Sequence, residues 1–244
     1  MSRLKKEQFQ GVVLGLAVGD AVGSAWEGIP ADMIFDMGPA DRIVEHPSAE
    51  PIYYTDDTQM MISVAQELAQ FGCLEKHRLA KRFAENYHPD RGYGQGARII
   101  INAIGFGEDW EKVAATIFRG DGSLGNGAAM RVAPVGVFFS PDMQRVIEQS
   151  DVSAEPTHCH EIGVDGARLI ATAAALAAES HGSKFDRHAF LLRLADIAQT
   201  EEFQWQIEHA LELEPYQTLI AFGNSLEAHR SVMTSILCFT DSTR

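Results

Sequence analysis

Apolar residues recur with helical spacing along most of the chain, and alternating strand patterns are scarce. Residues three, four and seven positions apart share one face of an α-helix, so each such stripe predicts a helix with one buried side. The stripes are Phe9-Val12-Val13-Leu16, Met60-Met61-Val64-Leu68, Leu79-Phe83-Tyr87, Ile162-Leu169-Ile170-Ala173-Leu176, 190–197 and 207–213. We therefore predict an all-α fold. The run from Arg131 to Ser140 fits a buried strand or a helix equally well.

Glycine-rich or acidic segments separate these stripes and are predicted to be loops. They cover residues 19–30, 51–57, 89–96, 120–127 and 156–160. No repeat, low-complexity tract or proline- and serine-rich linker marks a boundary. The sequence therefore predicts a single domain over residues 1–244.

The composition is that of a globular protein with an acidic surplus, since 20 Lys and Arg face 34 Asp and Glu for a net charge of −14. This argues against a general nucleic-acid or membrane-surface binder, because such proteins need a basic patch. The three cysteines are far apart and favour a reducing cytoplasm. Lys5 and Lys6 precede an apolar run as in a signal peptide, but Glu7 and Asp20 interrupt that pattern. A packed helix is the better interpretation, and no membrane span is expected.

The first candidate for chemistry is the segment Tyr53–Thr58 (YYTDDT), directly before the stripe that starts at Met60. Threonine and aspartate cap helices and complement the helix dipole. Adjacent carboxylates flanked by hydroxyls also offer the hard oxygen ligands that Mg²⁺ or Mn²⁺ prefers. The residues alone favour a metal site and a plain cap about equally.

Two glycine-containing segments are candidates for ligand binding. Residues 120–127 (GDGSLGNG) could turn their backbone amides inward around an anion, or form a flexible surface turn. No Gly-Lys-Ser/Thr follows, which excludes a Walker-type phosphate loop. In residues 90–94 (DRGYG), Arg91 could meet an anion and Tyr93 could stack on a base, although a solvated turn fits equally well.

The segment Thr157-His158-Cys159-His160 has residue types that bind zinc, but the chain has no second His/Cys cluster to complete the site. A Cys-His nucleophile likewise has no supporting motif. A histidine that forms hydrogen bonds beside a ligand pocket is the more plausible interpretation.

Taken in order, these segments resemble the ADP-ribosylglycohydrolase family. The resemblance is carried by residues 11–27, 53–58, 90–96, 123–134, 157–158 and 222–239, and so spans nearly the whole chain. The YYTDDT and DRGYG segments are most similar to the branch that removes ADP-ribose from serine and from poly(ADP-ribose), rather than to the arginine-directed branches.

The resemblance implies a compact orthogonal bundle of helices with a binuclear Mg²⁺ site, or Mn²⁺ in some members. It implies a hydrolase that cleaves the O-glycosidic bond of ADP-ribose on a protein or in poly(ADP-ribose). Glu27, Thr55, Asp56 and Asp57 would be metal ligands, with Glu27 and Asp57 catalytic. The implied substrate contacts are Asp90, Gly92, Tyr93, Gly122, Ser123, Leu124, Gly125, Asn126 and His158.

One departure from the family pattern concerns the C-terminus. Family members carry a further Asp-x-Asp-Thr motif that supplies ligands to both metals, whereas the printed sequence ends at Arg244. The segment Thr240-Asp241-Ser242-Thr243 lacks the flanking glycines and the second aspartate. We therefore expect a C-terminally truncated domain with a weakened metal site and an uncovered apolar surface that favours homo-oligomers. The alternatives are a non-catalytic ADP-ribose-binding module and a helical scaffold.

Overall fold

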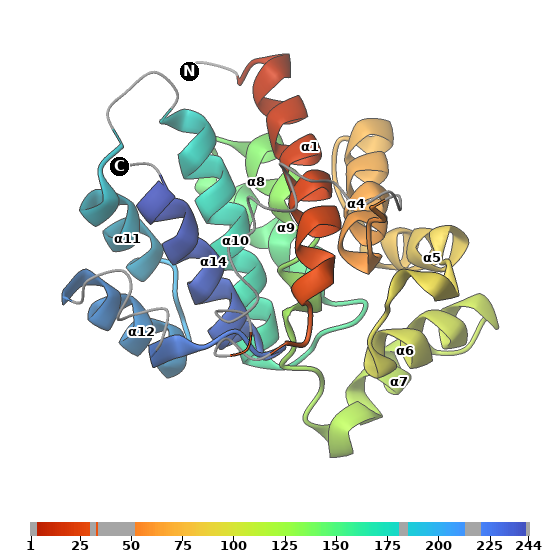
Figure 1. Ribbon diagram of the computed structural model, residues 1–244. Coiled ribbons are helices and arrows are strands. Elements are labelled where there is room, and N and C mark those ends of the chain that lie inside the picture. The colour runs from red at the N-terminus through yellow and green to blue at the C-terminus, as the bar shows by residue number, and fades with distance from the viewer. Residues whose placement is uncertain (1–3, 30–32, 34–51, 181–184, 213–220, 243–244) are drawn as a thin grey trace.

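The computed structural model describes residues 4–29, 33, 52–180, 185–212 and 221–242. Every regular element in these ranges is a helix, and a single isolated bridge joins Gly125 to Glu227. This confirms the all-α prediction (Figure 1). The α-helices are α1 (Lys6–Gly23), α4 (Asp56–Phe71), α5 (Lys76–Asn86), α6 (Gln95–Gly105), α7 (Trp110–Thr116), α8 (Ala133–Phe139), α9 (Met143–Ala154), α10 (Glu161–Glu179), α11 (Arg187–Ala195), α12 (Glu201–Glu212) and α14 (Ala228–Ser242).

Helix α10 is the central element, with α8 and α9 packed on one side and α11 and α14 on the other (Figure 1). Its contact with α8 is close because Gly136 has no Cβ, and a Cβ there would collide with the carbonyl of Ala171. The two sides of α10 hold separate apolar clusters. Met60, Leu79, Phe83 and Val135 belong to the first cluster, and Leu191, Phe203, Ile207 and Met233 belong to the second.

Two of the predicted stripes form the buried faces of α4 and α5, whereas the stripe of α1 is only partly buried. Met60, Met61, Val64 and Leu68 of α4 are all buried, as are Leu79 and Phe83 of α5. The ambiguous run from Arg131 to Ser140 contains the short helix α8 with Pro134 in its first turn, a position where the missing N–H costs no hydrogen bond.

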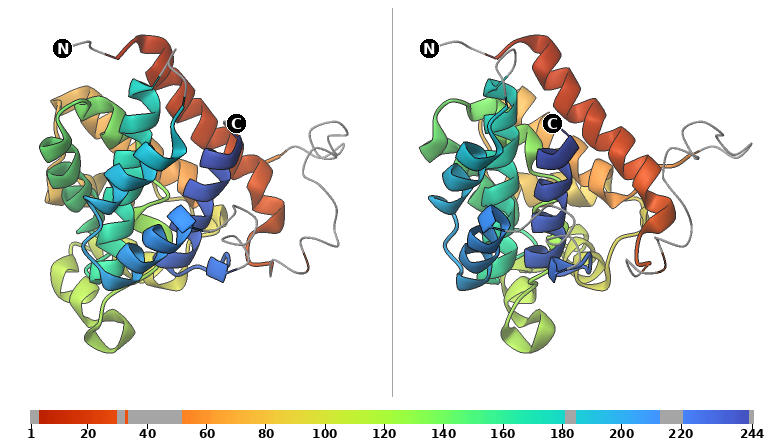
Figure 2. Two further views of the ribbon diagram at one scale, coloured as in Figure 1. Left: turned by 90° about the vertical axis from the view of Figure 1, so that its left-hand side faces the viewer. Right: turned by 60° about the vertical axis from the view of Figure 1, so that its left-hand side comes forward.

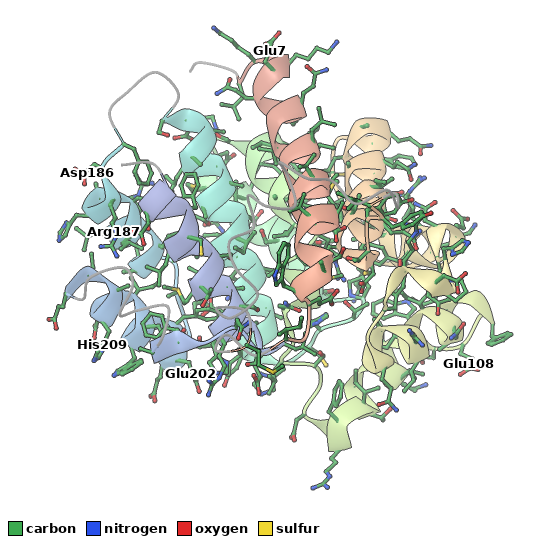
Figure 3. The ribbon with its side chains drawn as sticks, in the orientation of Figure 1. Glu7, Glu108, Asp186, Arg187, Glu202 and His209 are labelled. Carbon is green, nitrogen blue, oxygen red and sulfur yellow. The ribbon has the colours of Figure 1, made fainter. Side chains whose placement is uncertain are left out.

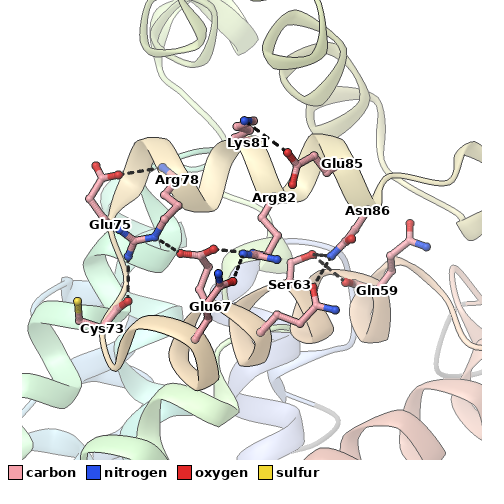
Figure 4. Close-up of polar contacts among 12 residues, drawn as sticks. Gln59, Ser63, Glu67, Cys73, Glu75, Arg78, Lys81, Arg82, Glu85 and Asn86 are labelled. Atoms are coloured by element: carbon pink, nitrogen blue, oxygen red, sulfur yellow. Dashed lines mark hydrogen bonds and ion pairs between the residues drawn. The ribbon is translucent and has the colours of Figure 1, made fainter.

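A buried carboxylate joins α4 to α5 (Figure 4). The side chain of Glu67 is fully buried, and its two oxygens accept hydrogen bonds from Nε of Arg78 and Nε of Arg82, the latter at 2.5 Å. Each arginine neutralises part of a charge that water cannot reach, so the three side chains form one structural unit.

Helix α1 lies across one side of the bundle and contacts α4 and α8 (Figure 2). The loop predicted for residues 19–30 is wrong in its first part, because α1 continues to Gly23 and a 3₁₀ turn, η1 (Ser24–Trp26), follows. Phe9 packs edge-to-face on Phe138, as expected for the inner face. The outer face is also apolar, since Leu14 and Val18 are more than 60% exposed.

This outer face bears on the prediction that the chain has no membrane span. Lys6–Trp26 is long and apolar enough to cross a membrane by length and composition, with a mean hydropathy of 1.2 and no buried residue in the window. Packed helices and signal sequences meet the same criterion, so the absence of a membrane span stays a prediction.

Candidate active site

A cavity of about 1250 Å³ opens where the C-terminal end of α1 meets the N-terminal ends of α4, α10 and α14. These ends of α1, α10 and α14 point to the lower part of the molecule in Figure 1. Among the predicted site residues, the lining includes Glu27, Thr55, Asp56, Asp57, Gly92, Gly122, Ser123, Leu124, Gly125, Asn126 and His158. The fold thus brings together, in one hollow, segments that are more than a hundred positions apart in the chain.

One wall of the cavity is acidic and is built on the first turn of α4. Thr55 caps the helix by accepting a hydrogen bond from the amide of Asp57, and Asp56 and Asp57 follow in the first turn. Burial and neighbouring carboxylates raise the pKa of Asp56 to about 6 and that of Asp57 to about 7. Burial and Asp20 raise the pKa of Glu27 as well. Burial and mutual repulsion therefore both oppose ionisation of these carboxylates.

Asp20, near the end of α1, organises this wall, and in the sequence it stands out only as a polar residue in an apolar run. Its carboxylate accepts hydrogen bonds from the amide and hydroxyl of Thr55, at 2.9 and 2.6 Å. It also accepts from the amide and hydroxyl of Thr58, at 3.1 and 2.5 Å. Polar residues spaced along an otherwise apolar helix are a weak signal, and no motif links Asp20 to a segment 35 residues away.

The glycine-rich loop, with the short helix η4 (Asn126–Ala128), forms another part of the lining. The amide of Gly125 bonds Ser123 Oγ at 3.3 Å, and the amide of Asn126 bonds the carbonyl of Leu226 at 2.9 Å. These two amides are already hydrogen-bonded within the protein, so fewer loop amides remain to bind an anion than the sequence predicted. The N-terminal ends of α10 and α14 adjoin the loop, and their dipoles favour a negatively charged ligand there.

His158 lies against this loop and is buried, and its ring is close to the backbone of Gly127. A Cβ on Gly127 would sit 2.9 Å from Cε1 of His158, which explains why glycine occupies that position. Burial and the nearby Arg131 lower the pKa of His158 to about 3, so the imidazole is neutral at physiological pH. The structure thus places an uncharged histidine in the cavity. Within the described ranges, Cys159 and the two histidines beside it form no cluster of three or more metal-binding side chains.

Two predicted substrate contacts do not line the cavity. Asp90 points to solvent, with its side chain 87% exposed and 3.8 Å from His88. Tyr93 is buried, and its hydroxyl donates to Oε1 of Gln59 at 2.8 Å. The aromatic ring in the DRGYG segment therefore belongs to the core, and Gly92 and Gly94 are the residues of that segment that line the cavity.

Phe118 is a cavity residue that sequence reasoning missed. It belongs to η3 (Ile117–Gly120) and is 54% exposed. Its ring lies so close to Gly96 that a Cβ on that glycine would be 3.0 Å from it. Phe118 and Arg119 both adopt positive φ angles, 53° and 66°, which non-glycine residues rarely do. Such strain gathers at functional sites. No local sequence motif predicts these positive φ angles.

Asp241 does not substitute for a C-terminal metal motif. It lies within α14, 3.7 Å from Arg187 of α11, at the side of the molecule where Arg187 is labelled in Figure 3. Neither Thr240 nor Asp241 lines the cavity.

Comparison with known proteins settles the family. The family model described as ADP-ribosylglycohydrolase matches residues 1–243. The chain belongs to the ADP-ribosylglycohydrolase family. The resemblance inferred from the sequence motifs is thereby confirmed.

Individual members of the family are similar to this chain over nearly its whole length. It is 32% identical to ADP-ribosylhydrolase ARH3 of Gallus gallus, over 98% of this chain and 74% of that protein. It is 30% identical to ADP-ribosylhydrolase ARH3 of Homo sapiens, over 95% of this chain and 72% of that protein. A solved structure titled ADP-ribosylglycohydrolase-related protein complex superposes with a TM-score of 0.70 at 21% identity, covering 95% of this chain and 75% of that one. That likeness shows that the two chains share a fold.

Proposed function

We propose that this ADP-ribosylglycohydrolase family member is a Mg²⁺-dependent hydrolase that cleaves the O-glycosidic bond of ADP-ribose attached to a protein or within poly(ADP-ribose). The observation that carries the proposal is the pairing of two unlike walls in one cavity. The same cavity is lined by an acidic wall of Asp20, Glu27, Asp56 and Asp57 and by a glycine-rich loop with a neutral histidine, His158. The names of its ARH3 relatives support the same class of substrate.

The cavity suits a ligand with the size and polarity of ADP-ribose. Its volume of about 1250 Å³ exceeds what a drug-sized molecule needs. Helix N-termini beside the glycine-rich loop favour a diphosphate, whereas the acidic wall would repel it. The diphosphate would therefore lie at the loop, and the ribose that carries the scissile bond would lie toward Glu27 and Asp57.

The donor set of the acidic wall fits a hard divalent cation. Carboxylate and hydroxyl oxygens are the ligands that Mg²⁺ and Mn²⁺ take. Burial first, and neighbouring carboxylates second, raise the pKa values of Asp56 and Asp57, and a bound cation would offset both effects. Thr55, Asp56, Asp57 and Glu27 would hold the metal. When bound, it would stabilise developing negative charge and lower the pKa of a coordinated water.

The chain's own side chains supply the remaining chemistry. Breaking an anomeric C–O bond passes through an oxocarbenium-like state, and an attacking water must lose a proton. A carboxylate oxygen of Glu27 or Asp57 can accept that proton, because both side chains line the cavity, and the carboxyl can return it to the departing glycosidic oxygen, which leaves as a hydroxyl. His158 would donate a hydrogen bond to the ligand at the loop. We assign serine-linked and polymeric ADP-ribose as substrates because the YYTDDT and DRGYG segments are most similar to the family branch that acts on these two linkages.

A second function, ADP-ribose binding without catalysis, is favoured by one observation. Among the described residues, no three His, Cys, Asp or Glu side chains converge closely enough to enclose a metal ion. A protein of this kind would bind ADP-ribose equally well with and without Mg²⁺ and would release no product.

Calorimetric titration of ADP-ribose, with Mg²⁺ and again with EDTA, tests the proposal. We expect binding in both conditions and tighter binding with Mg²⁺. Equal affinity in the two conditions would support the non-catalytic alternative. Absence of binding by a folded protein would contradict both functions.

A further inference from the structure

Arg131 is a fully buried cation in the lining of the cavity. Its Nη2 donates to the carbonyl of Ser153 at 2.5 Å and to Oγ1 of Thr157 at 2.8 Å. The guanidinium carbon lies 4.6 Å from the ring centroid of Phe83, and Nη1 lies 3.6 Å from Sδ of Met60. Burying a guanidinium is costly, so its few polar contacts matter. One of those contacts leads to His158.

The hydrogen bonds around Thr157 set the direction of a short relay. Oγ1 of Thr157 lies 2.7 Å from Nδ1 of His158 and 2.8 Å from Nη2 of Arg131. A guanidinium can only donate, so it occupies a lone pair of the threonine oxygen. The buried hydroxyl must then give its own proton to an acceptor, and in the described part of the chain Nδ1 of His158 is the acceptor within reach.

This direction determines which nitrogen of His158 carries the proton. If Nδ1 accepts, it is unprotonated, and a neutral imidazole must carry its hydrogen on Nε2. Nε2 faces the glycine-rich loop, since a Cβ on Gly127 would lie 3.2 Å from it and one on Gly125 would lie 3.8 Å from it. The imidazole is neutral because burial and Arg131 lower its pKa to about 3.

Resting on the function proposed above, we infer that Arg131 and Thr157 are positioning residues that hold His158 as a permanent Nε2–H donor aimed at the bound ADP-ribose. His158, as a neutral imidazole, then donates a hydrogen bond to an oxygen of the ligand and does not act as a base. The charged and titratable groups that act on this relay are Asp56 and Tyr93, both through Arg131, and Arg131 itself. Burial lowers the pKa of Arg131 to about 9, which leaves it cationic at neutral pH.

The tautomer can be measured directly on the ligand-free protein. In a sample with ¹⁵N-labelled histidine, a long-range ¹H–¹⁵N spectrum distinguishes a protonated ring nitrogen from an unprotonated one, and the signals lost in His158→Gln assign this residue. We expect Nε2 to be protonated and Nδ1 unprotonated at pH 7, with no titration between pH 5 and 8. A protonated Nδ1, or titration within that range, would overturn the inference.

Thr157→Val keeps the shape of the side chain and removes the hydroxyl. We expect His158 to lose its single tautomer and ADP-ribose affinity to fall about tenfold, as for one hydrogen bond. Thr157→Ser should restore both. Thr172→Val is the matched control, because Thr172 lies within α10, is similarly buried, and has a hydroxyl with no hydrogen-bond partner among the described residues.

The two readouts separate this inference from the proposed function. A Nε2–H tautomer that is unchanged in Thr157→Val would show that Thr157 does not position His158. A correct tautomer in a protein that binds no ADP-ribose would instead contradict the proposed function and leave His158 without the ligand assigned here.

Discussion

The carboxylate of Asp20 accepts two hydrogen bonds from Thr55, one from its amide at 2.9 Å and one from its hydroxyl at 2.6 Å. The same carboxylate accepts two more from Thr58. The end of α1 is thereby fixed to the start of α4. Because Asp56 and Asp57 lie between the two threonines, Asp20 determines where these two carboxylates stand in the cavity.

Replacing Asp20 tests this positioning role. Asp20→Ala removes four acceptor contacts, so we expect the free energy of unfolding to fall by about 2–4 kcal/mol and Mg²⁺ affinity to fall at least about tenfold. Urea unfolding and Mg²⁺ calorimetry measure the two effects. Glu7→Ala, at the exposed start of α1 (Figure 3), is the control for removing a carboxylate from this helix. Mg²⁺ affinity equal to that of the wild type in Asp20→Ala would refute the role.

The double substitution Asp56→Asn and Asp57→Asn tests the acidic wall. We expect Mg²⁺ binding and ADP-ribose release to be lost, because two anionic oxygen ligands become neutral amides. The protein should remain folded with an equal or higher melting temperature, since buried carboxylates that repel one another are removed. Circular dichroism and an ADP-ribose release assay check both expectations.

The matched control for that variant is Glu108→Gln, which neutralises an exposed carboxylate far from the cavity (Figure 3). It should leave turnover and metal binding unchanged. If the double variant also turned over normally, the acidic wall would have no part in catalysis.

Gly127→Ala tests the close approach of the loop to His158. The added methyl would lie 2.9 Å from Cε1 of the imidazole, so the ring or the loop must move. We expect ADP-ribose affinity to fall about tenfold with the helical content retained. Gly105→Ala, at the end of α6 with no atom within 4 Å of its Cβ position, should bind as the wild type does. Equal affinity in the two variants would mean that the loop and His158 do not form the ligand site.

Glu67→Gln tests the structural unit of α4 and α5. Both arginines would lose their carboxylate, and we expect the free energy of unfolding to fall by about 3 kcal/mol. Glu85→Gln breaks the exposed pair with Lys81, 3.6 Å apart, and should cost less than about 1 kcal/mol. Urea unfolding compares the two. Similar losses of unfolding free energy in both variants would show that burial does not increase the contribution of Glu67 to stability.

Helix faces and the cavity segments could be predicted from the sequence because each depends on residues close together in the chain. The buried stripe of α4 is one example, and the cap at Thr55 with its two aspartates is another. The full helical content could not be predicted. Helix α1 runs through a segment expected to be a loop, since its glycines at positions 19 and 23 suggested a break, whereas the helix continues to Gly23 and Asp20 bonds Thr55 and Thr58 from this last part of it.

Contacts between distant segments explain the remaining differences. Tyr93 was expected to contact substrate because the DRGYG segment resembles that of the family, but its hydroxyl bonds Gln59 in the core. The relay from Arg131 to His158 joins residues 27 positions apart, and the strain at Phe118 has no local signature. Such features arise only once helices pack.

Release of ADP-ribose from a serine-ADP-ribosylated peptide and from poly(ADP-ribose), measured with Mg²⁺ and with EDTA, tests the central claim most directly. We predict release by the wild type with Mg²⁺, and none with EDTA or in the double variant of Asp56 and Asp57. No release from either substrate by a folded wild-type protein with Mg²⁺, or equal release by the double variant, would contradict the claim.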